Sequence, residues 1–333
     1  MVSFYVLQLF NGLVNGGFIA LMSLGLSIVF GLMRVVNFAH GAMYMLGAFV
    51  AFIGGHYFGI SLWFALILSW LLVGGLGVIL ERLLLSRLYR LDPAYNLLLT
   101  FGLTMIIEDL MRTFFATTGG QFLVPHLLSG VVDLGFTFYP KYRLFVLAVS
   151  VVMCLAAWFV LERTRVGALV RAATERPELL KCFGGNVPRL ISGTFFCATG
   201  LAGLAGALAA PIRSVSPFMG QEMVALTFAV VVAGGMGSIV GSVLMGFIVG
   251  VLSALSAIWY PPASVAITYI IMLAVLVVRP GGIFRGVDIS NFPLHYTPMT
   301  ERARRIFQSN GLLLAAVATG VVLPWIVYPV VAT

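Results

Sequence analysis

Three ionisable side chains stand close together in an otherwise apolar stretch of this sequence. Glu108, Asp109 and Arg112 lie within residues 95–118. Glu108 precedes Arg112 by four residues, which on a helix predicts an ion pair that lowers the cost of burying both charges. The alternative is a proton relay through Glu108 or Asp109, with Asp109 facing a cavity.

The motifs of nucleotide binding and hydrolytic catalysis are missing. The lysines, Lys141 and Lys181, do not follow glycine, so no phosphate-binding loop of the form GxxxxGK[ST] can be written. Neither HExxH nor GxSxG occurs. The three cysteines have no CxxC spacing, which argues against a metal site or a disulfide framework. We therefore expect that this chain is not an enzyme and that it binds no metal or cofactor.

Two glycine-bearing segments interrupt the apolar stretches at corresponding places. One runs through Asn37-Phe38-Ala39-His40-Gly41 and the other through Gly234-Gly235-Met236-Gly237-Ser238. Non-helical backbone at membrane depth must line a wet cavity or be buried in protein, and it recurs at transporter substrate sites. Both segments are therefore candidates for a solute path. An equally open alternative is that both segments are ordinary hairpins. Their glycines would then end helices or allow close packing, and His40 would be a structural residue.

Composition places these residues in a membrane protein. Hydrophobic residues make up 61% of the 333 residues and charged residues 9%, against about a quarter charged in soluble domains. The basic residues lie in short loops, where they meet lipid headgroups, so nucleic acid is not an expected partner. We predict an all-α polytopic membrane protein with about eight spans, broken helices and a ninth span at the C-terminus.

Charge asymmetry orients these spans. With the N-terminus outside and retained as a span, fifteen of the 19 basic residues fall in cytoplasmic loops. The three outer basic residues are Lys141, Arg143 and Arg213. This orientation requires the stretch 223–260 to be split at its glycines into a descending and an ascending span.

The longest cytoplasmic loop, residues 162–189, predicts a short surface helix. Thr174 is its expected N-cap, Pro177 falls in its first turn, and Gly184 ends it. The helix would dock into a partner's groove or lie on the headgroups. Its apolar face would be Leu179, Leu180 and Phe183, with Glu175, Arg176 and Glu178 exposed.

Several elements together resemble the LivH-type permease of branched-chain amino acid ABC importers. The resemblance covers about residues 8–285, and the combination of NFAHG with GGxGS is specific. The matching elements include Asn11-Gly12-Leu13, Val36-Asn37-Phe38-Ala39-His40-Gly41, Tyr44-Met45-Leu46-Gly47-Ala48, Leu201-Ala202-Gly203 and Gly234-Gly235-Met236-Gly237-Ser238.

The resemblance implies an ABC importer permease in the bacterial cytoplasmic membrane. It implies a second permease subunit, of LivM type or a copy of this chain, two ATPases that bind ATP and Mg²⁺, and an external substrate-binding protein. Its cargo would be branched-chain or other amino acids, or related small amides and organic acids. The translocation path would include Asn37, Phe38, His40, Gly41, Tyr44, Gly234, Gly235, Gly237 and Ser238. The ATPases would couple through Arg171, Thr174, Glu175, Glu178, Leu179, Leu180, Phe183 and Gly184.

The expected domains are a permease domain over 1–285, a basic cytoplasmic linker over 286–310 and the extra span over 311–333. The resemblance does not cover that last span. A proton-coupled secondary carrier and a passive channel for small solutes remain the alternative functions.

Overall fold

The computed structural model describes residues 2–33, 36–89, 91–115, 122, 124–133, 135, 138–175, 177–259, 261, 263–279 and 281–284. These residues belong to one compact unit, Met1–Asp288. The expected linker over 286–310 and span over 311–333 lie outside the described residues.

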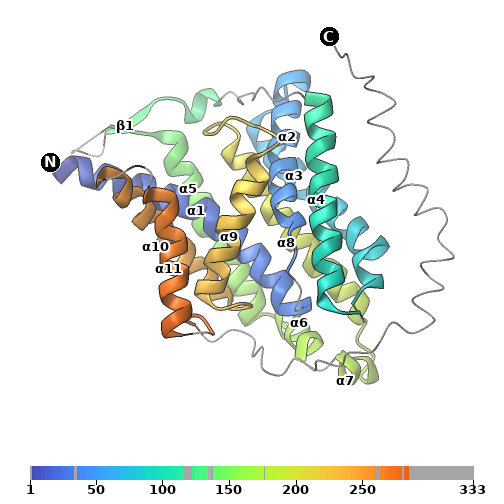
Figure 1. Ribbon diagram of the computed structural model, residues 1–333. Helices are drawn as coiled ribbons and strands as arrows, with labels where there is room; N and C mark the ends of the chain where they lie inside the picture. Colours follow the sequence, from blue (N-terminus) through green and yellow to red (C-terminus); the bar gives the residue numbers. More distant parts are fainter. Residues whose placement is uncertain are drawn as a thin grey trace, which may run out of the picture. The chain divides into compact units, whose positions relative to one another are not determined.

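Long apolar helices dominate the described part of the chain (Figure 1). Six of them are long and apolar enough to cross a membrane: α1 (Val2–Met33), α2 (Ala39–Phe58), α3 (Leu62–Leu83), α5 (Lys141–Arg163), α8 (Val187–Ala209) and α10 (Ile239–Trp259). Two shorter apolar helices, α9 (Met219–Gly234) and α11 (Ala263–Val278), and the less apolar α4 (Pro93–Phe115) accompany them.

The described residues thus hold nine such helices, one more than the eight spans expected ahead of the C-terminal one. Residues 223–260 contribute two of these helices, α9 and α10, which confirms the predicted break. At this break Gly235 and Gly237 have φ values of 106° and 83°. Both values lie in the region that glycine adopts without strain.

Helix α1 lies at the centre of the unit. It packs against α5, α8, α9 and α10, while α8 also packs against α2 and α3. Small residues let these backbones approach closely: a Cβ on Gly47 of α2 would collide with the backbone of Gly203 of α8. Such contacts provide dispersion energy in a lipid environment, where the hydrophobic effect gives little drive for helix association.

Short elements connect the long helices. Between α4 and α5 stand η2 (His126–Leu128) and an antiparallel pair of strands, β1 (Val131–Asp133) and β2 (Phe138–Pro140), with Val132 opposite Tyr139. The Tyr139 hydroxyl of β2 and the Arg143 guanidinium of α5 both donate to Asn11 Oδ1, at 3.1 and 2.6 Å, and fix the hairpin and the start of α5 to α1. After α3 comes η1 (Leu85–Arg87).

The segment between α5 and α8 folds as two helices, α6 (Arg165–Glu175) and α7 (Pro177–Cys182). The predicted N-cap role of Thr174 is therefore wrong. Thr174 lies in the last turn of α6, where its hydroxyl donates to the Val170 carbonyl at 3.0 Å. Proline is tolerated at the first position of a helix, and Pro177 begins α7. The predicted end is confirmed, since the chain turns at Gly184 with φ 78°.

Candidate functional site

Helix α4 carries a buried polar stripe. Asn96, Thr100, Thr104 and Glu108 follow one another at intervals of four residues and are all buried against the rest of the unit. Large apolar side chains such as Leu98 and Ile106 are instead exposed. The polarity of α4 is thus the reverse of a water-soluble helix, which is expected when apolar residues face lipid and polar residues face the protein interior.

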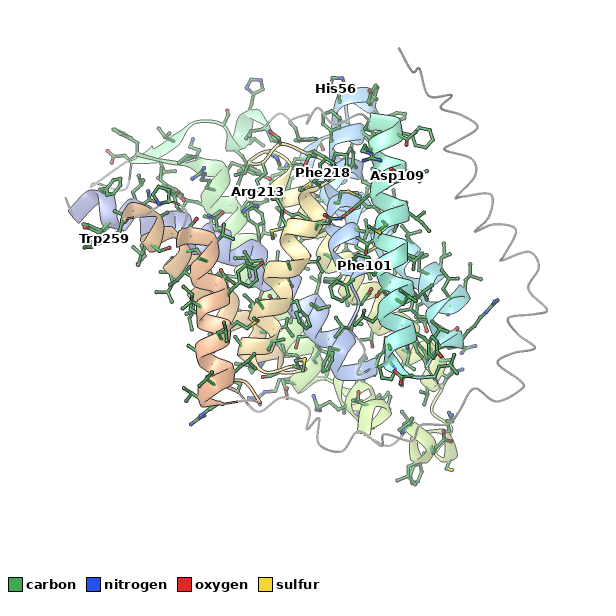
Figure 2. The ribbon with its side chains drawn as sticks, in the orientation of Figure 1. His56, Phe101, Asp109, Arg213, Phe218 and Trp259 are labelled. Atoms are coloured by element: carbon green, nitrogen blue, oxygen red, sulfur yellow. The ribbon has the colours of Figure 1, made fainter. Side chains whose placement is uncertain are left out.

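The break between α1 and α2 meets this stripe. The Phe38 backbone N–H donates to Thr100 Oγ1 at 3.2 Å, and Asn37 Oδ1 accepts from the Ala39 N–H at 3.1 Å. The Phe38 ring lies 6.3 Å from both Phe101 of α4 and Phe228 of α9, measured between centroids. Phe101 sits partway along α4, as Figure 2 shows. Three aromatic rings from separate elements therefore stand together beside the stripe.

Glu108 ends the stripe on the side away from Phe38. Its Oε2 accepts a hydrogen bond from Gln221 Nε2 of α9 at 2.6 Å. Its Oε1 is buried without a hydrogen-bond partner in the described part of the chain.

The expected ion pair between Glu108 and Arg112 is wrong. Arg112 pairs with Asp109 at 2.5 Å, and about half of each of these side chains is exposed. Asp109 lies on α4 (Figure 2), and its half-exposed side chain is not buried against the rest of the unit. Glu108 is turned inward to a partner 113 residues away, which local helical spacing does not encode.

The other path residues predicted near the first break lie inside α2. His40 is fully buried against α1, where its Nε2 is 3.2 Å from the Met22 carbonyl oxygen. Gly41 faces α9, because a Cβ there would collide with the backbone of Gly220. The Tyr44 hydroxyl is buried without a described hydrogen-bond partner and lies within electrostatic reach of Arg213. None of the described hydrogen bonds links these three residues to the α4 stripe.

The glycines of the second break make turns and close contacts. Gly234, the last residue of α9, packs against the backbone of Gly241 in α10. Ser238 Oγ accepts from the Gly241 N–H at 3.2 Å and caps the start of α10. These contacts match the packing alternative for Gly234, Gly235, Gly237 and Ser238, and no described hydrogen bond links them to α4.

The loop between α5 and α8 presents a different apolar surface from the one expected. Leu180 is buried against Ala173, Val187 and Leu32, whereas Leu179 and Phe183 are 48% and 86% exposed. The three side chains therefore do not share one face.

Polar residues of this loop form local pairs. Arg171 pairs with Glu162 at 3.5 Å, and the exposed Glu178 pairs with Lys181 at 3.0 Å. Glu175 is the last residue of α6. Helices α6 and α7 lie at the same end of the unit as the end of α1 (Figure 1).

A second buried carboxylate, which the sequence reasoning missed, lies near that end. Glu81 of α3 accepts from the Tyr89 hydroxyl and from Ser192 Oγ of α8, both at 2.7 Å. Burial and the hydrogen bond to Glu81 raise the pKa of Tyr89 above its ordinary value. The network joins α3, α8 and the segment before α4.

Sequence reasoning also missed Asn96, Thr100, Thr104 and Gln221. The first three carried a usable signal, because polar residues at intervals of four in an apolar stretch mark one face of a helix. Gln221 carried none, since only the packing of α9 near α4 brings it to Glu108.

Residues 8–278 match the family described as the branched-chain amino acid transport system permease component. The chain belongs to this family. It is a membrane-embedded permease subunit of an ABC importer, as the LivH-type resemblance implied, so a transport component and not an enzyme. A proton-coupled carrier and a passive channel are set aside.

Several curated relatives of this permease cover most of its length. The high-affinity branched-chain amino acid transport system permease protein LivH of Salmonella typhimurium is 27% identical, over 84% of this chain and 95% of its own length. BraD of Pseudomonas aeruginosa is also 27% identical, with the same coverage of both chains. LivM of Escherichia coli is 30% identical over 66% of this chain and 56% of its own. No solved structure matches. The likeness to both LivH and LivM indicates that such permeases work in pairs.

Proposed function

We propose that this permease forms, with a second permease subunit, the path by which an ATP-driven importer carries branched-chain or other small amino acids into a bacterial cell. The cargo follows from the names of LivH, BraD and LivM, which are branched-chain amino acid permeases. The observation that carries the proposal is the buried polar stripe of α4, which gives a polar solute hydrogen-bonding groups inside an apolar protein.

The path runs along α4 between Glu108 and Phe38. With the N-terminus outside, α4 ascends, so Glu108 lies in its outer half. Thr100, which holds Phe38, is seven residues from the start of α4, about 10 Å along the axis. Phe38, Phe101 and Phe228 then form an apolar constriction on the cytoplasmic side of the path. Asn37, His40, Gly41 and Tyr44 extend the path at the start of α2, and Gly234, Gly235, Gly237 and Ser238 extend it at the end of α9.

The cytoplasmic ATPases, which bind ATP and Mg²⁺, dock on the loop 162–189. Its exposed apolar side chains, Leu179 and Phe183, suit a groove in a partner protein. Leu180 packs against Leu32, and Leu32 lies about one helical turn before the break that contains Phe38. Movement of α7 on an ATPase is thereby passed to the path. An external binding protein delivers the substrate on the opposite side.

Uptake in proteoliposomes tests this function. The permease, its partner permease and the candidate ATPases are reconstituted, with the binding protein and radiolabelled L-leucine outside and ATP on the ATPase side. We expect accumulation that requires hydrolysable ATP and the binding protein. Uptake that persists with a non-hydrolysable ATP analogue would overturn the proposal.

A further inference from the structure

The Glu108 carboxylate lacks the partners that a buried charge requires. It is 8% exposed, one oxygen accepts from Gln221, and the other has no hydrogen-bond partner among the described residues. The ion pairs of the described residues do not include it. A buried carboxylate that lacks a cation is costly, so the site favours a ligand that brings positive charge and hydrogen-bond donors.

The position of Glu108 restricts what that ligand is. The described residues hold no group of three or more His, Cys, Asp or Glu that would hold a metal ion. A single carboxylate beside an amide suits a small ammonium group, because an ammonium donates to the free Oε1 while Gln221 holds Oε2. The buried hydroxyls of Thr104 and Thr100 continue the polar surface from this point toward Phe38.

We propose that Glu108 and Gln221 form the subsite that binds the α-ammonium group of an amino acid during its passage through the permease. This inference rests on the proposed function and assigns substrate recognition to the permease itself. The two residues come from α4 and α9, and α4 packs mainly against α2. A relative movement of α4 and α9 would therefore open or close the subsite.

Asp109 provides a matched control. It is the adjacent acid on the same helix, but it is half exposed and already paired with Arg112. Neutralising Asp109 removes the same charge at nearly the same depth without touching the subsite.

The test compares Glu108→Gln, Glu108→Asp and Asp109→Asn in the complete reconstituted importer, with L-leucine as the probe. L-leucine uptake and ATP hydrolysis stimulated by the binding protein are measured in parallel. We expect Glu108→Gln to lower uptake at least tenfold while ATP hydrolysis stays within twofold of wild type. Glu108→Asp, which keeps the charge, should transport better than Glu108→Gln, which keeps the shape. Asp109→Asn should keep uptake within twofold.

Three results would overturn this inference while leaving the proposed function intact. They are normal uptake by Glu108→Gln, better uptake by Glu108→Gln than by Glu108→Asp, and a parallel fall of uptake and ATP hydrolysis, which marks a structural role. If the wild-type importer shows no ATP-dependent uptake of L-leucine, the proposed function fails and this inference fails with it.

Discussion

At the scale of single residues, contacts between glycines decide how close the helices come. Gly41 of α2 and Gly220 of α9 touch through their backbones, and a Cβ on Gly41 would also reach Val224. Closely packed interiors do not absorb added atoms without shifts of backbone or side chains. The position of α9 relative to the break at Phe38 therefore depends on residue 41 being a glycine, which has no side chain.

We predict that Gly41→Val destabilises the permease by about 1–3 kcal/mol, the usual cost of overpacking. The measurement is the thermal midpoint of the purified protein in detergent. Gly102→Ala is the control, because a Cβ on Gly102 of α4 meets nothing within 4 Å. That control should leave the midpoint unchanged or raise it slightly, since alanine favours helix more than glycine does. Equal midpoints for Gly41→Val and wild type would contradict the prediction.

Prediction of single residues from the sequence worked where the role of the residue depends only on its neighbours in the chain. Gly184, Gly235 and Gly237 were expected to end or turn helices, and all three have positive φ. It failed where a distant partner decides the outcome. Spacing alone paired Glu108 with Arg112, but Gln221 on another helix holds Glu108 and leaves Arg112 to Asp109.

At the scale of elements, the positions of helices were predictable because apolar stretches of membrane length are bounded by charge and glycine. The expected split of residues 223–260 is found at Gly234 and Ile239. The loop 162–189 was harder, since its two short helices take their orientation from contacts. Leu180 is buried by Leu32 and Val187, which leaves Leu179 and Phe183 exposed.

We predict that Phe183→Ala weakens the attachment of the ATPases. A large exposed aromatic side chain is a typical anchor, and truncation of such anchors commonly costs about 2 kcal/mol or more of binding energy. Co-purification of the ATPases and leucine-dependent ATP hydrolysis measure the effect. Phe138→Ala is the matched control, because Phe138 is also exposed but lies in the β hairpin between α4 and α5. Equal ATPase recovery from both variants would refute the role of Phe183.

At the scale of the whole molecule, the proposed orientation sets which loops face the cytoplasm. Cys182 is exposed at the end of α7, on the loop 162–189. Ser129 follows η2, on the loop between α4 and α5. The two positions should lie on opposite sides of the membrane.

We predict that a membrane-impermeant maleimide labels Cys182 in inside-out vesicles and not in right-side-out cells. The background carries Cys197→Ser, and Cys182→Ser serves as the unlabelled control. Ser129→Cys in a Cys182→Ser background should give the opposite pattern. Labelling of Cys182 from the outside would place the N-terminus in the cytoplasm, against the proposed orientation.

The buried polar stripe of α4 also bears on how the protein is made. Helix α4 has 23 residues, yet it is not among the six helices apolar enough to cross a membrane by themselves. A charged group at the centre of a helix opposes insertion by about 2.5–3.5 kcal/mol, and Glu108 adds to the cost of Asn96 and two threonines. During synthesis, α4 therefore depends on other helices that offer its polar face a protein surface. Helix α2 is already made by then, but Gln221 of α9, which holds Glu108, is made later, so α4 should reach its final place only after α9 is synthesised.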